Sequence, residues 1–120
     1  MTATDFTILT GDPTGEVAIW RAAARREAVL HAADDYRAAR RAVEQSRAAV
    51  VELKHDRETA RDVLTVCKAL SPEIADDAHR AYLDANNAVI AAELAQREAW
   101  HELADACNRL TAAAMGERDD

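Results

Sequence analysis

Two pairs of residues in this chain have the types and the spacing of metal ligands. Glu52 and His55 are three residues apart, and so are Glu98 and His101. In an α-helix this spacing places a carboxylate and an imidazole on adjacent turns of one face, where both can approach one cation. Transition metals accept such mixed oxygen and nitrogen donors. The two pairs are therefore candidate metal ligands.

This spacing resembles the Glu-x-x-His motif of ferritin-like di-iron bundles, in which two other helices each add a further Glu. The resemblance implies a carboxylate–histidine metal-binding helical protein with Glu52, His55, Glu98 and His101 as ligands. In the register derived below, both pairs point away from the contact between the helices. They also lie about 12 Å apart along the axis, at 1.5 Å per residue, so they can meet only across two chains. We keep this function as the alternative.

Catalytic patterns are incomplete in the sequence. Glu102 and Asp105 resemble the Glu-x-x-Asp magnesium motif of all-α nucleotide pyrophosphatases, but the companion Glu-x-x-Glu of a preceding helix is missing. There is no glycine-rich phosphate loop and no nucleophile with a matched base. We therefore expect a protein that is not an enzyme and that takes no cofactor.

The composition favours long helices over a globular core. Of the 120 residues 49% are hydrophobic, alanine is the commonest of these, and only 4% are aromatic. Large apolar side chains are therefore scarce, whereas alanine lets two helix backbones approach closely along their length.

Charge and hydropathy argue against several classes of protein. The net charge is −7 and no long basic run occurs, which disfavours nucleic-acid binding. No apolar stretch approaches the roughly 18 residues of a membrane helix, and the N-terminus lacks the features of a signal peptide. We expect a cytoplasmic protein. The bias toward arginine and alanine is typical of a high-GC bacterium or its phage.

A break at Leu70-Ser71-Pro72-Glu73 organises the rest of the chain. Ser71 is a good N-cap, Pro72 suits the first helical position, and Glu73 favours the positive end of the helix dipole. The sequence accordingly predicts five segments: an extended or disordered N-terminal arm over 1–15, a long helix over 16–70, a turn over 71–73, a second helix over 74–115, and a disordered acidic tail over 116–120.

Both predicted helices carry the heptad repeat of a coiled coil. In the first helix the a positions are Val29, Tyr36, Val43, Val50, Arg57 and Leu64, and the d positions are Ala32, Ala39, Ser46, Leu53, Ala60 and Cys67. In the second helix the a positions are Tyr82, Val89, Gln96, Leu103 and Leu110, and the d positions are Ala78, Ala85, Ala92, Ala99, Ala106 and Ala113. We call these positions together the seam. The unbroken alanine series predicts that the two helices approach closely.

A tight turn at Ser71 sets the register of the antiparallel pair, because paired residue numbers then sum to about twice 71. Large side chains face small ones in nearly every layer, as Leu103 faces Ala39. Ser46 falls opposite Gln96 and predicts one polar layer that holds the register. The predicted fold class is all-α: a long antiparallel helical hairpin, an alanine-rich coiled coil, which we expect to dimerise into a four-helix bundle.

Two apolar surfaces have no partner in this hairpin. Residues 16–26 extend beyond the predicted second helix, so the first helix either breaks near 25–27 or presents its apolar residues to another chain. The second helix has an apolar edge on the side away from the seam, and long helices with two apolar faces pack on a third element. The predicted partner-binding residues are Val17, Ile19 and Trp20 together with Leu83, Ile90, Leu94 and Trp100.

These surfaces favour a function in association. We expect a non-catalytic protein–protein interaction, assembly or structural module that binds neither nucleic acid nor membrane. It acts through homo-oligomerisation, with a homodimer as the simplest form, or by docking on another helical protein.

The chain also resembles, in length and hairpin form, the helical-hairpin proteins exported by type VII secretion. The resemblance implies export together with a second hairpin protein. Leu70-Ser71-Pro72 replaces their Trp-x-Gly turn, and Tyr82 is followed by Asn86 where their C-terminal Tyr-x-x-x-Asp/Glu signal requires an acid. An exported hairpin protein is the further alternative.

Overall fold

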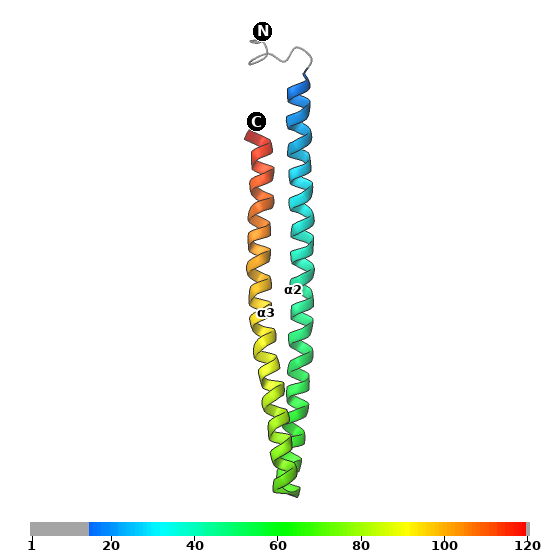
Figure 1. Ribbon diagram of the computed structural model, residues 1–120, viewed down its shortest axis with the longest axis vertical. Coiled ribbons are helices and arrows are strands. Elements are labelled where there is room, and N and C mark those ends of the chain that lie inside the picture. Colours follow the sequence, from blue (N-terminus) through cyan, green and yellow to red (C-terminus); the bar gives the residue numbers. More distant parts are fainter. Residues whose placement is uncertain (1–14, 120) are drawn as a thin grey trace. The chain divides into compact units, whose positions relative to one another are not determined.

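A computed structural model describes residues 15–119 and shows an all-α helical hairpin, which confirms the predicted fold class. Helix α2 spans Glu16–Leu70 (55 residues) and helix α3 spans Pro72–Asp119 (48 residues). Within the described part, only Gly15 and Ser71 lie outside these helices. The helices run in opposite directions from the turn (Figure 1). Of the predicted N-terminal arm, residues 1–14 lie outside the described residues.

A single residue, Ser71, separates the two helices. The Ser71 N–H donates to the Cys67 carbonyl (3.1 Å), which continues the hydrogen-bond pattern of α2 to its end. The Ser71 carbonyl accepts from the Ala75 N–H (2.9 Å), which begins the pattern of α3. Pro72 fits the first position of α3 because its missing N–H needs no partner there. The turn is therefore shorter than the predicted 71–73.

The helix boundaries differ from the prediction at two further places. Helix α2 has no break near 25–27, because Ala22–Ala28 contains neither glycine nor proline and consists of good helix formers. Helix α3 continues through Gly116 to Asp119 instead of ending at Met115. One glycine inside a helix costs only about 1 kcal/mol relative to alanine, which the remaining helical hydrogen bonds can offset. The residues predicted as a tail over 116–120 are thus helical up to Asp119.

Gly15 starts α2 with a backbone conformation that suits glycine. Its φ of 77° lies in the left-handed region, which a residue with a Cβ atom rarely adopts. The Gly15 carbonyl accepts from the Ile19 N–H (3.0 Å), so it satisfies one of the amides at the start of the helix.

The contacts divide the hairpin into two compact units, and each is described by itself. One unit is Ala38–Ala104, which contains the turn. The other comprises Met1–Arg37 with Asp105–Asp120, of which 15–37 and 105–119 are described.

In the Ala38–Ala104 unit, the predicted seam is the buried contact between the helices. The buried residues are Val43, Val50, Leu64, Cys67, Ala78 and Val89, and all of them are seam residues. The other seam residues of this unit are half-buried: Ala39, Ser46, Leu53, Arg57, Ala60, Tyr82, Ala85, Ala92, Gln96, Ala99 and Leu103. Near the turn, Leu64, Cys67 and Ala78 form one cluster against which Tyr82 packs. The Leu64–Ala78 contact matches the predicted register, since the two numbers sum to twice 71.

Polar contacts across the seam differ from the predicted layer. The Ser46 hydroxyl donates to the Val43 carbonyl of its own helix (2.8 Å) and makes no hydrogen bond to Gln96. A Ser hydroxyl often bonds a carbonyl one turn earlier in its helix, where no partner helix has to position the acceptor. Instead, the Arg57 guanidinium donates to the Asn86 side-chain oxygen across the seam (3.1 Å).

We expect the Arg57–Asn86 hydrogen bond to couple the two helices energetically. In a double-mutant cycle with Arg57→Met and Asn86→Ala, the coupling should be about 0.5–1.5 kcal/mol, because a charged donor bonds a half-buried amide oxygen. Thermal or urea unfolding of the four proteins measures it. Additive effects of the two substitutions would show that the hydrogen bond does not couple the two helices energetically.

In the other unit, Ala32 and Ala106 are buried, and Val29, Tyr36 and Leu110 are half-buried. The seam therefore continues through 29–36 and 106–113 as predicted.

This unit also extends the seam by one heptad toward the start of α2, at Ala22 and Arg25, which are half-buried. Residue 25 follows the d series, where an arginine can bury the aliphatic stem of its side chain. The predicted unpartnered segment 16–26 is shorter than expected, because α3 reaches Asp119 rather than Met115.

Candidate interaction surface

Helix α3 exposes four large apolar side chains outside the seam. Leu83, Ile90, Leu94 and Trp100 are each between 45% and 49% exposed, and all belong to the Ala38–Ala104 unit. Separations of seven and four residues keep Leu83, Ile90 and Leu94 on one side of the helix. Each residue thus presents about half of its surface to solvent at a place where a further helix could pack.

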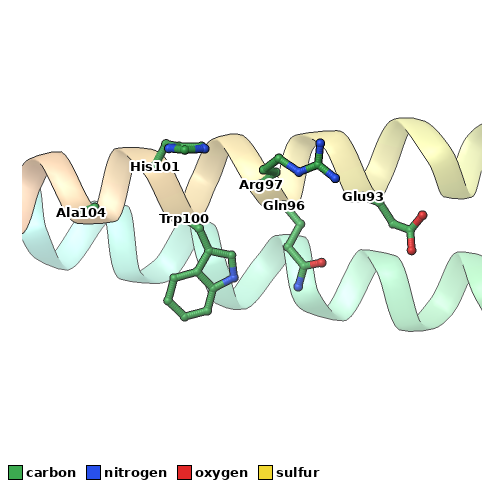
Figure 2. A pocket seen from close by; sticks show the side chains of 6 residues that line it. All are labelled: Glu93, Gln96, Arg97, Trp100, His101 and Ala104. Carbon is green, nitrogen blue, oxygen red and sulfur yellow. The ribbon is translucent and has the colours of Figure 1, made fainter.

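Trp100 lies between the seam and the solvent-exposed side of α3. Figure 2 shows its indole extending from α3 toward α2, as does Gln96, whereas Arg97 and His101 lie on the side of α3 away from α2. A shallow hollow beside the indole is lined by Arg40, Val43, Glu44, Arg47, Trp100 and Leu103, which come from both helices. The hollow that Figure 2 displays is lined by α3 alone, so it has no opposing wall to enclose a small molecule.

Helix α2 exposes its first apolar residues more strongly. Trp20 is 74% exposed, the largest exposed fraction among the large hydrophobic residues described, and Val17 and Ile19 are also exposed. These three belong to the unit of 15–37 and 105–119. A tryptophan in this position leaves a large apolar ring in water, which is typical of a residue that anchors a contact with another protein.

The turn end of the Ala38–Ala104 unit carries a further apolar group, which the sequence reasoning missed. Val63, Val66, Leu70 and Ile74 are all exposed. Val63 and Val66 line a shallow hollow of about 260 Å³ together with Asp62 and Cys67. The i, i+3, i+7 spacing of Val63, Val66 and Leu70 was the signal that could have identified this group.

Two edges flank the seam in the Ala38–Ala104 unit. Consecutive helix residues are rotated by about 100°, so the residue after a seam position lies to one side and the residue before it lies to the other. In an antiparallel pair, the residues that directly follow the d positions of one helix lie along the same edge as the residues that directly follow the d positions of the other helix. The Lys54–Glu93 ion pair (3.5 Å) shows this directly, since Lys54 follows Leu53 and Glu93 follows Ala92.

We call the edge formed by the residues that directly follow a seam position in the sequence the basic edge. Every d residue of α2 in this unit is followed by a cation, and these cations lie about 10 Å apart along the helix. The five cations of α2 are Arg40, Arg47, Lys54, Arg61 and Lys68, and all are exposed. Arg97 of α3 is a sixth cation on this edge. The carboxylates on this edge are Glu44, Glu58, Asp76 and Glu93. Val51, Leu83, Ile90 and Trp100 lie on the same edge.

We call the edge formed by the residues that directly precede a seam position in the sequence the acidic edge. Within 38–104, the residues directly before a seam position include no Lys, Arg or His. The charged residues there are Glu52, Asp56, Asp77, Asp84, Glu98 and Glu102, all exposed, with Ala42, Ala49, Ala81, Ala88 and Ala95 between them. Val63, Val66 and Leu70 lie at its turn end. The two edges therefore differ in the sign of their charge.

The predicted metal ligands are spread over the surface. Glu52, His55, Glu98 and His101 are all exposed. Among the described residues, no group of three or more His, Cys, Asp or Glu side chains is arranged to hold a metal ion. The two Glu-x-x-His pairs are thus not joined by the further carboxylates that the ferritin-like motif requires. Cys67 is buried in the seam, and Cys107 is exposed.

Comparison with known proteins adds no family to this description. No protein-family model, curated protein or solved structure matches the chain. In the part of the chain that the structure describes, no helix has both the length and the apolar character that crossing a membrane requires.

Proposed function

We propose that this protein is a non-catalytic helical interaction module that assembles with a second copy of itself or docks on another helical protein. The apolar residues of its contact surface are Val17, Ile19 and Trp20 of α2 and Leu83, Ile90, Leu94 and Trp100 of α3. A cytoplasmic location is part of this proposal.

The imbalance between core and exposed apolar residues supports this proposal. The buried residues of the described part are few, and half of them are small: of the eight, three are alanine and one is cysteine, and among their large side chains only Val89 is fully buried. Two tryptophans and several Leu, Ile and Val residues remain exposed in the same helices. Exposed apolar residues that recur along one helix mark a surface for a protein partner, whereas isolated ones need no explanation.

The experiment that tests this function is solution mass by light scattering on the wild type and on Trp20→Glu/Ile90→Glu. We expect the wild type to associate and the variant to be monomeric with unchanged helical circular dichroism, because a glutamate at each site must be desolvated in the contact. Ala48→Glu/Ala69→Glu is the control, since it adds the same charges at exposed positions of α2 outside the proposed surface.

A variant beginning at Glu27 separates the two parts of the surface. Loss of association on truncation would place the contact at Val17, Ile19 and Trp20, and unchanged association would place it on α3. A Trp20→Glu/Ile90→Glu variant that keeps the wild-type mass would show that the proposed surface is wrong. A wild type that is monomeric at every concentration would exclude self-assembly and leave only docking on a different helical protein.

A further inference from the structure

We propose that the basic edge of one Ala38–Ala104 unit docks on the acidic edge of a second copy, so that hairpins assemble side by side. This inference rests on the proposed function and identifies the partner as the chain itself. It also identifies which surfaces meet, because the two edges of one hairpin carry opposite charges.

The cations of the basic edge are only partly neutralised within their own chain. Lys54 pairs with Glu93 of α3, and Arg61 pairs with Glu58 one turn earlier in α2. Arg40, Arg47 and Lys68 form no ion pair with any residue of the described part. Three guanidinium or ammonium groups in one row therefore remain available to carboxylates of another molecule.

The acidic edge has carboxylates available in the same spacing. Asp77, Asp84 and Glu98 each directly precede a d-position alanine of α3, so they recur with the heptad, and Ala91 interrupts the row between them. Asp77 lies 4.0 Å from Arg80, an exposed contact one turn away that contributes little. Asp84 and Glu98 form no ion pair with the described residues.

The two rows match when a second α3 runs antiparallel to α2 and is shifted by three residues, about 4.5 Å, along the axis from the level of its own α3. Residue numbers that sum to 145 are then level: Lys68 with Asp77, Arg61 with Asp84, Lys54 with Ala91, and Arg47 with Glu98. The interruption at Ala91 coincides with Lys54, the cation of this row that already has a partner across the seam. The other three cations, Lys68, Arg61 and Arg47, each lie at the same level as a carboxylate of the second copy.

Apolar residues occur on both edges and would be buried in the same contact. The basic edge contributes Val51, Leu83 and Ile90, and the acidic edge contributes Val63, Val66 and its row of alanines. The alanines of the acidic edge, set against the larger residues of the basic edge, allow helices to approach closely, as they do in the seam.

Contacts between like edges are electrostatically less favourable. Two acidic edges would bring together carboxylates without any cation, and like charges in an interface suppress association. A contact between unlike edges leaves one free edge of each kind on the pair, so further copies can add. We therefore expect assembly that grows with concentration instead of stopping at a closed dimer.

The test uses two full-length variants of opposite charge. Arg47→Glu/Arg61→Glu reverses the charge at two cation positions of the basic edge, and Asp84→Arg/Glu98→Arg reverses the charge at the two carboxylates of the acidic edge that are level with them. We expect each variant alone to need a protein concentration at least about tenfold higher for the same mean mass. An equimolar mixture should regain a mass above that of the monomer, because the unmodified edges of the two variants are complementary and the reversed charges at 47 and 61 face the reversed charges at 98 and 84. Arg41→Glu/Arg80→Glu is the control, with the same charge change outside both edges.

Sedimentation or light scattering at low salt and at 1 M NaCl reads out the result. Loss of mass in each variant, recovery in the mixture, and weakening of the wild-type assembly by salt support the inference. Wild-type mass in either variant, or a mixture that stays monomeric, would overturn it. Association that survives these charge changes but is lost in Trp20→Glu/Ile90→Glu would refute the edge contact and leave the proposed function standing. A monomeric wild type would overturn the inference as well.

Discussion

Replacement of Val89 by aspartate should strongly destabilise the Ala38–Ala104 unit. Among the residues that the structure describes, Val89 is the one large side chain with 0% exposure, and it lies in the seam where the register places Leu53 opposite. A carboxylate there loses its hydration without gaining a cation, which costs about 3 kcal/mol or more. For a unit of this size, we expect the melting temperature to fall by about 12 °C or more.

Val51→Asp is the matched control for Val89→Asp. Val51 is 65% exposed, so the same substitution should change the free energy of unfolding by no more than about 0.5 kcal/mol. Both variants are melted by circular dichroism at a protein concentration at which all three proteins are monomeric, because association would raise the apparent stability. Equal melting temperatures for the two variants would show that the seam is not the stabilising contact.

Replacement of Leu64 by alanine is expected to be the second large effect. Leu64 is 8% exposed and packs with Cys67 and Ala78 in the cluster near the turn. Removal of three carbon atoms leaves a space that the small Ala78 cannot fill. We expect the free energy of unfolding to fall by about 2–3 kcal/mol, toward the lower end for buried leucines because two helices can partly close the gap.

Leu70→Ala is the control for the same change of side chain at an exposed position. Leu70 is 69% exposed in the last turn of α2, so its truncation should cost much less. Urea unfolding of both variants gives the comparison. If Leu64→Ala were as stable as Leu70→Ala, the large-against-small packing of the seam would not contribute to stability.

The helical hairpin and its register were predictable from the sequence because they depend on repeated local signals. A heptad of apolar and alanine residues buries one stripe of a helix wherever the chain runs, and every predicted seam residue of the described part is buried or half-buried. The caps at Ser71 and Pro72 determine where the chain reverses, and the reversal point determines which residues are level.

Helix ends and polar contacts were not predictable in the same way. Whether α3 stops at Met115 or passes Gly116 depends on a difference of about 1 kcal/mol, which one glycine does not decide. The Ser46 hydroxyl could donate to Gln96 or to a carbonyl of its own helix, and in the structure it donates to the Val43 carbonyl of its own helix. Arg57 was expected only as a seam residue, and its bond to Asn86 depends on where a long side chain can reach.

The sequence alone determined that two long helices pair along an alanine seam and leave apolar residues outside it. It also contained the charged rows, since a base follows each d position of α2 in 39–67. Only the tertiary structure decided which rows share an edge. That assignment needs the relative direction and rotation of the two helices, which the Lys54–Glu93 and Arg57–Asn86 contacts establish. Periodicity places a residue on a face of its own helix, whereas the sign of charge on an edge is a property of two helices together.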